Sequence, residues 1–449
     1  MNSEPRTSVH GTWSGRWTFI LAAAGSAVGL GNIWKFPYMA GENGGGAFVL
    51  IYLICILLIG VPIMVAEILI GRRGRSSPAN SMEYLAKEAN TFPAWKLLGV
   101  MGAVAGLLIL SFYSVAAGWA VAYIFEGFNG TSANYYGESF DSFLQDETSL
   151  LFFHSIFILT TVAIVARGVI KGLEVWINRL MPILFIIVIL LCLYATQTGA
   201  FFEGVAYLFT PDFSKINGSI ILAALGQAFF TLSLGMGAIM AYGAYMPSKQ
   251  NIGSTAISVA FLDTSVALLA GMAIFPIVFA NDLQTASGPG LVFVTLPWAF
   301  VNMPLGLLFG KLFFILLSIA ALSSAISLLE PGVAWFVESF KTKRYVAAIG
   351  LGLIAWTLGI FSALSFGLLS DFTLVGDRNF FDSMDFLSNQ ILLPLGGIFI
   401  AIFVGWVMKK EKVLEELEIK NELIIKVWFF FLKYVAPLTI VMIFVEGLI

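Results

Sequence analysis

The feature that most constrains the fold is a series of long apolar stretches, which recur along the whole chain and are nearly free of charge. Of 449 residues, 59% are hydrophobic and only 11% are charged, and the mean hydropathy is +0.91. A soluble domain carries roughly 25% charged residues, and a helix needs about 20 apolar residues to cross a bilayer. The chain is therefore predicted to be an all-α integral membrane protein.

The apolar stretches predict eleven transmembrane helices in one domain that covers residues 1–449. Their approximate ranges are 15–40, 43–70, 96–126, 149–167, 174–196, 217–245, 252–280, 306–339, 345–367, 385–408 and 424–446. The segment before the first span is polar and lacks a small-residue cleavage site, so we expect the first span to be retained.

Basic residues indicate which loops face the cytoplasm, because short cytoplasmic loops carry an excess of Lys and Arg. The loops after the even-numbered spans hold such residues, for example Arg72, Lys341 and Lys410. The loop after the third span instead holds acidic residues and has no basic residue before Arg167. We therefore expect a cell-membrane protein with a cytoplasmic N-terminus and an external C-terminus.

Two spans contain interruptions where a continuous helix is expected. Gly25, Gly29 and Gly31 lie near the middle of the first span, and each costs roughly 1 kcal/mol relative to Ala in a helix interior. The second interruption is "TLSLGMG" at 231–237, in the sixth span. Irregular backbone at this depth is tolerated only where it is buried in protein or lines a polar cavity. The alternative is that the glycines only permit close helix packing.

The two interruptions lie five spans apart. Because five is odd, the second block of five helices enters the membrane from the opposite side. The sequence thus predicts an inverted five-plus-five repeat with broken helices 1 and 6, over about 15–196 and 217–408, and an extra helix over about 424–446. Broken helices at matching positions are typical of secondary transporters, where they mark a binding site near the bilayer midplane.

Several segments resemble the signature segments of the neurotransmitter:sodium symporters. They are "GSAVGLGNIWKFP" at 25–37, "ENGGGAF" at 42–48, "GQAFFTLSLGMG" at 226–237, "GLVFVTLP" at 290–297 and "ALSSAISLLEP" at 321–331. The resemblance extends over nearly the whole chain and is to the prokaryotic eleven-span amino-acid transporter type. It implies that the protein is not an enzyme but imports an amino acid with sodium by alternating access.

The resemblance also implies two sodium sites, made of oxygen atoms that the helix breaks leave free. The first sodium is implied to bind Ala27, Asn32, Thr231 and Asp263. The second is implied to bind the carbonyls of Gly25, Val28 and Ala320 and the hydroxyls of Ser323 and Ser324. From the residues alone, the two serines are expected to bond their own helix, as serines in membrane helices usually do.

Asp263 is the most informative ionisable residue, because a carboxylate inside a membrane helix is functional by default. The family often has Asn at this position, and its chloride-dependent members supply a nearby Ser. Here the residue four positions later is Ala267. A fixed carboxylate can replace chloride as the compensating negative charge, so we expect chloride-independent transport.

Gly29 stands where monoamine carriers of the family have Asp, so the resemblance implies an amino-acid substrate. The residues implied to bind it are Ser26, Ala27, Leu30, Gly31, Ile109, Tyr113, Phe230, Thr231, Ser233, Met236, Ser324, Ser327 and Leu328. The part of this set that faces the substrate side chain has no charge. A neutral, mostly hydrophobic or aromatic amino acid is therefore expected, because a charged group would remain unpaired.

The resemblance assigns an outer gate to Lys35 and Asp385, which are expected to form an ion pair above Phe230 and Tyr113. The alternative for Lys35 is that its side chain extends to a membrane interface.

The inner gate is assigned to Trp13 and Glu338. His10 stands where the family usually has the Arg partner of the acid, and Arg6 is a further candidate for that role. Glu67 is interpreted as a structural acid near this gate.

Two other classes remain open at this point: a channel-like protein and a non-transporting membrane amino-acid sensor. We expect a small-molecule amino acid, sodium ions and the lipid bilayer as partners, Na+ as the only cofactor, and no nucleic acid.

Overall fold

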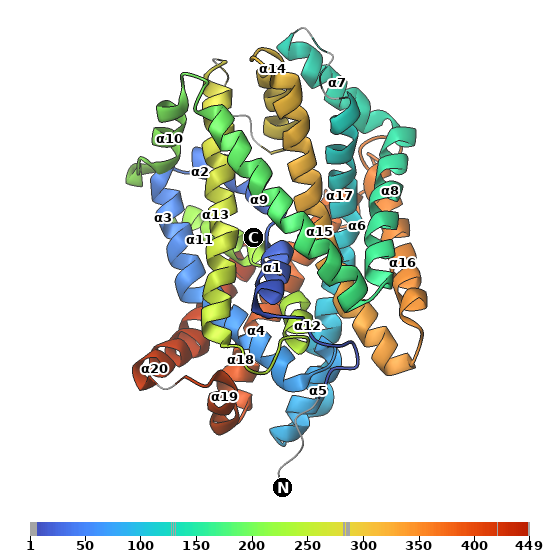
Figure 1. The fold of residues 1–449 in the computed structure, drawn as a ribbon, viewed down its shortest axis with the longest axis vertical. Coiled ribbons are helices and arrows are strands. Elements are labelled where there is room, and N and C mark those ends of the chain that lie inside the picture. The colour runs from blue at the N-terminus through green and yellow to red at the C-terminus, as the bar shows by residue number, and fades with distance from the viewer. Residues whose placement is uncertain are drawn as a thin grey trace.

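The computed structural model describes residues 7–447 except 127, 129, 131, 282, 284–287 and 420, so Arg6 lies outside the described residues. Its helices form a bundle (Figure 1). In chain order the α-helices are α1 (Arg16–Ala27), α2 (Phe36–Glu42), α3 (Gly46–Cys55), α4 (Val61–Gly74), α5 (Pro78–Glu88), α6 (Lys96–Glu126), α7 (Ala133–Gln145), α8 (Glu147–Ala166), α9 (Val175–Ala195), α10 (Phe201–Phe209), α11 (Gly218–Thr231), α12 (Ala238–Ala244), α13 (Ile252–Phe279), α14 (Leu296–Val301), α15 (Gly306–Phe340), α16 (Arg344–Leu364), α17 (Phe380–Asp385), α18 (Leu393–Ile402), α19 (Lys410–Leu417), α20 (Glu422–Phe430) and α21 (Ala436–Glu446).

π-helical turns join several of these helices end to end, so that the joined pieces cross the membrane together. They include η2 (Ile56–Gly60), η7 (Phe386–Leu392) and η9 (Phe431–Val435). η1 (Gly31–Lys35) continues directly into α2, and η8 (Phe403–Val407) forms the end of the span that contains α18. Among the described residues, nine helices, counted with the π-helical turns that continue them, are long and apolar enough to span a bilayer. The prediction of an all-α membrane protein is confirmed.

The two predicted breaks are present. α1 and the helix over Gly31–Glu42 make a tenth span that is bent by 59°. The sixth predicted span is divided into α11, with 14 residues, and α12, with 7 residues, each too short to cross the bilayer alone.

The short helices between the spans were not predicted. α5, for example, starts with Pro78 in its first turn and buries Met82 and Leu85 along one face only. A long hydropathy window misses such a helix, because its other face is polar. Figure 1 places α5 and α19 at the end of the bundle where the N-terminus lies, and α7 and α14 at the opposite end.

Close helix contacts hold the broken spans in the middle of the bundle, where Figure 1 shows α1 and α12. A Cβ atom on Gly71 of α4 would lie 2.0 Å from the carbonyl oxygen of Met240 in α12. A Cβ atom on Gly106 of α6 would lie 2.5 Å from the carbonyl oxygen of Leu328 in α15. Any larger residue at these positions would push the helices apart.

An ion pair is buried where α15 meets the start of α16. The Arg344 guanidinium donates to both carboxylate oxygens of Glu330, and its Nε donates to the Val165 carbonyl at 2.8 Å. The Tyr245 hydroxyl donates to Glu330 Oε1 at 2.7 Å. Glu330 has no exposed surface, so this network connects the end of the sixth span to two scaffold helices.

The basic residues after the second span also have partners that the sequence did not reveal. Arg72 donates to Glu416 of α19 and to the Gln250 carbonyl, both at 2.5 Å. Arg75 donates to the Met246 carbonyl and, at 2.8 Å, to the Ser248 hydroxyl. The arginines therefore cap the end of α12 and fasten α19 against α4.

Replacing Arg344 with Gln leaves the Glu330 carboxylate buried without its counter-charge. We expect a loss of about 3–5 kcal/mol in the free energy of unfolding, seen as a clearly lower melting temperature in detergent. Lys343→Gln, at the exposed neighbouring position, is the control and should melt like the unmodified protein. Equal melting temperatures for the two variants would contradict a stabilising role for the pair.

Candidate functional site

The site begins at the break in the first span. α1 ends at Ala27, and Val28 is extended, with φ −70° and ψ 107°. The Gly29 amide donates to Asn32 Oδ1 at 3.1 Å, and the Leu30 amide donates to the Tyr113 hydroxyl at 3.2 Å. Side chains thus supply the hydrogen-bond acceptors that a continuous helix would offer to these two amides.

The break in the sixth span covers residues 232–237, between α11 and α12. Ser233, Gly235 and Gly237 have positive φ values of 54°, 83° and 76°. Gly adopts this region freely, whereas a non-glycine residue there costs of order 1–3 kcal/mol. The strain at Ser233 is therefore offset by the contacts that fix the segment.

Two contacts hold this second break. The Ser233 hydroxyl donates to the Ser26 carbonyl at 2.8 Å, which links the two breaks directly. Glu67 Oε1 accepts from the Gly235 amide at 2.7 Å, and Glu67 is fully buried. The sequence singled out Glu67 as a structural acid, but its position against the break became clear only from the structure.

A buried polar cluster lies beside the two breaks. Asn32 Nδ2 donates to Asp263 Oδ1 at 2.7 Å and to the Asp263 carbonyl at 3.1 Å. The Thr231 hydroxyl lies 3.1 and 3.2 Å from the two carboxylate oxygens of Asp263. All three residues are at most 1% exposed. The cluster thus brings together three of the four residues assigned to the first sodium.

Asp263 has no cationic partner in this cluster. The ion pairs found among the described residues do not include it. A carboxylate at this depth is costly unless something compensates its charge. The cluster is therefore a candidate site for a small cation with oxygen ligands.

The residues assigned to the second sodium lie where α1 packs against α15. A Cβ atom on Gly25 would lie 3.4 Å from Ser323 Cβ, and one on Gly29 would lie 3.4 Å from Ser324 Cβ. The Ser323 hydroxyl donates to the Ala320 carbonyl at 3.0 Å. Ser323 thus makes the bond to its own helix that the residues alone suggest.

A small cavity separates the two breaks. Its volume is about 20 Å³, which is room for about one water molecule. All predicted substrate-binding residues line it except Ser26 and Ser327, and Gly29 lines it in addition. The Ser26 hydroxyl donates to Ser327 Oγ at 2.7 Å, so these two side chains bond each other instead. The lining must move apart to admit an amino acid.

Comparisons with known proteins agree with this geometry. The model of the sodium:neurotransmitter symporter family matches residues 10–149 and 143–449. A sodium-dependent transporter of Bacillus subtilis strain 168 is 40% identical over 441 residues, which is 97% of each chain. The crystal structure of MhsT in complex with L-phenylalanine is 47% identical, has a TM-score of 0.88, and is matched over 97% of this chain and 99% of that chain.

The chain belongs to the sodium:neurotransmitter symporter family. It is a multi-pass membrane protein that uses sodium as the co-transported ion, and the family consists of transporters, not enzymes. A more distant relative, the human sodium- and chloride-dependent GABA transporter 2, is 24% identical over 474 residues, which is 92% of this chain and 76% of that one.

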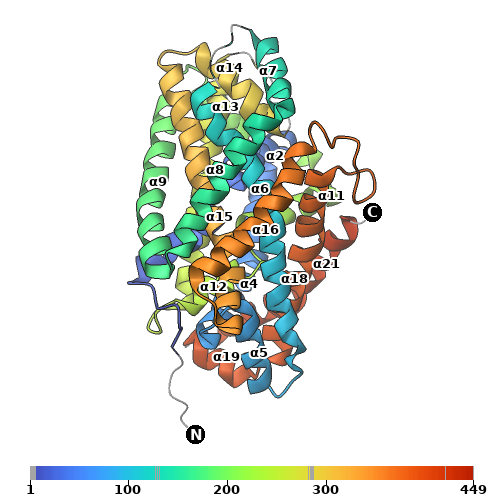
Figure 2. The same cartoon turned by 90° about the vertical axis from the view of Figure 1, so that its right-hand side faces the viewer.

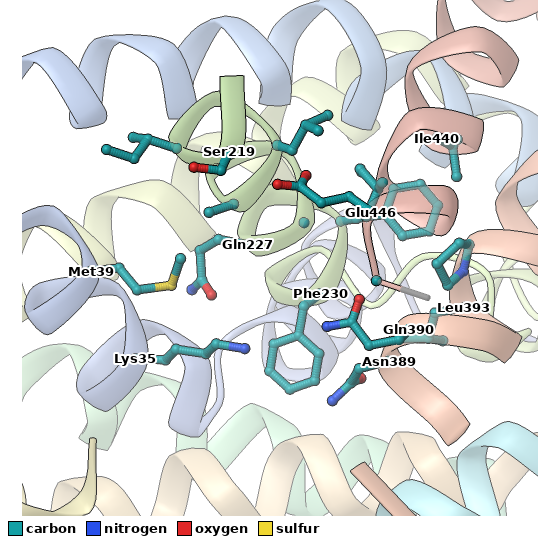
Figure 3. A pocket seen from close by; sticks show the side chains of 18 of the residues that line it. Lys35, Met39, Ser219, Gln227, Phe230, Asn389, Gln390, Leu393, Ile440 and Glu446 are labelled. Carbon is teal, nitrogen blue, oxygen red and sulfur yellow. The ribbon is translucent and has the colours of Figure 1, made fainter. Parts of the chain in front are cut away.

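The symporter has a larger cavity on the other side of Phe230, shown in Figure 3. Its volume is about 480 Å³, and its polar lining includes Lys35, Gln227, Gln390 and Glu446. Phe230 lines both cavities and so separates them. Gln227 and Glu446 were not predicted to line a cavity. The polar amide of Gln227 within the apolar run of α11 was a signal in the sequence that could have identified it.

The predicted outer ion pair is not formed in this conformation. Lys35 Nζ lies 5.3 Å from the centre of the Phe230 ring, toward which its side chain points (Figure 3). Asp385 Oδ1 instead accepts from Asn389 Nδ2 at 2.6 Å. Lys35 and Phe230 thus cover the small cavity together, through a cation–π contact.

The predicted inner-gate residues Trp13 and Glu338 both make contacts near the N-terminal end of the chain. Trp13 is 2% exposed, and its Nε1 donates to the Tyr242 carbonyl at 3.2 Å. His10 Nε2 lies 3.1 Å from Glu338 Oε1, so the histidine is a partner of this acid. The Ser77 amide also donates to Glu338, at 2.8 Å. Along the first span Trp13 precedes the small cavity and Lys35 follows it, so contacts of the predicted gate residues lie on both sides of the cavity.

Proposed function

We propose that the protein imports a neutral, mostly hydrophobic or aromatic amino acid with sodium by alternating access. The observation that carries this proposal is the buried Asp263 carboxylate, which has no counter-charge and lies beside two broken helices around a shared cavity. A bound sodium ion supplies the missing charge, and the free ends of the broken helices receive the charged groups of the amino acid.

The first sodium is assigned to the Ala27 carbonyl and to the side chains of Asn32, Thr231 and Asp263. The hydrogen bonds among the last three support this assignment, because they gather several oxygen atoms around one point. The second sodium is assigned to Gly25, Val28, Ala320, Ser323 and Ser324. The close approach of α1 and α15 supports it.

The substrate carboxylate is assigned to the amides of Leu30 and Gly31 and to the Tyr113 hydroxyl, which already accepts from the Leu30 amide. The ammonium group is assigned to the carbonyls of Ala27, Phe230 and Thr231 and to the Ser233 hydroxyl. The remaining lining, with Ile109, Met236 and Leu328, is apolar and buried. MhsT, whose structure was solved in complex with L-phenylalanine, supports an aromatic or aliphatic substrate.

Alternating access requires that the two closures open in turn. Outward opening would move Phe230 and Lys35 away from the small cavity and join it to the 480 Å³ cavity. Inward opening would separate Trp13 from Tyr242 and His10 from Glu338. Closure on both sides favours a symporter over a channel, since a channel needs one continuous path.

We also assign the protein one transport domain over residues 1–449, with a cytoplasmic N-terminus and an external C-terminus. The arginines and lysines of the loops near α5 and α19 support this orientation. Figure 2 shows these two helices at the end of the bundle where the N-terminus lies.

Sodium-dependent binding of the common amino acids to the purified protein tests the proposed substrate and ion site. We expect L-phenylalanine and aliphatic amino acids to bind in sodium but not in potassium. Asp263→Asn should raise the sodium concentration for half-maximal binding by roughly 10–100-fold, since a charge-assisted contact is worth about 1.5–3 kcal/mol. Ser323→Ala should raise it by a smaller factor.

Exposed Asp371 and Ser318, whose hydroxyl donates to the Phe314 carbonyl of its own helix, provide matched controls. Asp371→Asn and Ser318→Ala should leave the sodium dependence unchanged. Binding of charged amino acids only, or equal binding in potassium, would overturn the proposal. Concentrative uptake into sealed vesicles distinguishes transport from a sensor.

Replacing chloride with gluconate tests the role of the fixed carboxylate. Asp263 supplies a permanent negative charge, and Ala267 has no hydroxyl to hold an anion. We therefore expect sodium-driven uptake to be the same in both salts. A large loss of uptake in gluconate would show that the protein shares the chloride dependence named for the human relative.

A further inference from the structure

A groove with three lysines lies on the last span, and it shares no lining residue with either of the cavities described above. Lys410, Lys426 and Lys433 line it together with Phe429, Phe430 and Tyr434, and its volume is about 230 Å³. We call these six residues the lysine groove. It lies between the start of α19 and the helices α20 and η9, at the lower left of Figure 1.

The positive charge of the lysine groove is poorly compensated. Among the described residues, Lys410 and Lys433 have no acidic partner within ion-pair distance. Lys426 Nζ lies 3.6 Å from Glu422, but both side chains are more than three-quarters exposed, and such pairs contribute little. Glu411 is the remaining acid next to the groove in sequence. The groove therefore favours a ligand with a negative charge.

Lys433 is held in place at this site. Its Nζ lies 5.2 Å from the centre of the Trp406 ring and 5.3 Å from that of Phe429. A Cβ atom on Gly405 would lie 2.9 Å from Lys433 Cγ, so the lysine stem packs on the backbone of η8. A charged residue inside a membrane helix is costly, so a lysine that is half-buried against aromatic rings in such a helix is a candidate for a functional role.

Exposed aromatic residues beside the groove are typical of the boundary of a bilayer. Trp406 and Tyr434 are 57% and 54% exposed, and Trp and Tyr are enriched at membrane–water interfaces. Lys410 follows the end of the tenth predicted span directly. Beyond the groove, Val427 of α20 and Leu438 of α21 continue an exposed apolar surface. An apolar chain attached to an anionic group would fit this surface.

We propose that the lysine groove binds the phosphate of an anionic phospholipid, whose acyl chains lie along α20 and α21. The lysines supply the charge that a phosphate requires, and the aromatic side chains cover the glycerol region. The apolar surface favours a lipid over free phosphate, which would use none of it. The proposal is independent of the substrate and sodium sites.

Native mass spectrometry of the full-length protein in detergent tests this proposal with three probes: phosphatidylglycerol, phosphatidylcholine with the same chains, and inorganic phosphate. We expect phosphatidylglycerol to bind more tightly than phosphatidylcholine. Lys410→Gln with Lys426→Gln should weaken phosphatidylglycerol binding by roughly 25-fold, from about fivefold for each lysine. Adding Lys433→Gln should weaken phosphatidylglycerol binding by a further factor of about five.

The matched control is Lys249→Gln with Lys343→Gln, which removes two charges from exposed positions outside the groove. It should leave lipid binding unchanged. Melting temperatures of all variants verify that they are folded. Equal binding of the two lipids, equal effects of the groove and control variants, or displacement of the lipid by phosphate at equal concentration would each overturn the proposal.

Discussion

The whole arrangement depends on one constraint: main-chain polar groups at bilayer depth need partners, and two helices are broken where the bilayer offers none. The chain meets this need with side chains from neighbouring helices. Tyr113 and Asn32 bind the first break, while Glu67 binds the second. What these contacts leave free are carbonyl oxygens and one buried carboxylate, which suit a small cation and a zwitterion.

The same constraint explains why the surrounding helices are so rigidly packed. A segment without helical hydrogen bonds keeps a defined conformation only if contacts with neighbouring helices hold it in place. Gly71 allows α12 to approach α4 closely, and the Glu330–Arg344 pair anchors the end of the same span through Tyr245. The broken span thus lies inside a closely packed frame of neighbouring helices.

Much of this was predictable because the signals are local. The glycines and "TLSLGMG" revealed the breaks, and the resemblance to the symporter family implied most of the residues that line the small cavity. Side-chain pairing was less predictable, since it depends on rotamers. Lys35 lies over Phe230 instead of pairing with Asp385, and Ser26 bonds Ser327 instead of lining the cavity.

The other features that the sequence did not predict were missed for similar reasons. Short amphipathic helices such as α5 escape a window that averages both faces, and the partner of Arg344 lies 14 residues away on another helix. The lysine groove joins Lys410 to Lys433 across a loop, so no single segment displays it.

Hydrogen–deuterium exchange in sodium and in potassium tests the central claim most directly. If sodium completes the oxygen groups at the breaks, the amides of residues 28–31 and 232–237 should exchange more slowly in sodium, while those in the middle of α6 should not change. Equal exchange of the two break segments in both salts would contradict the account.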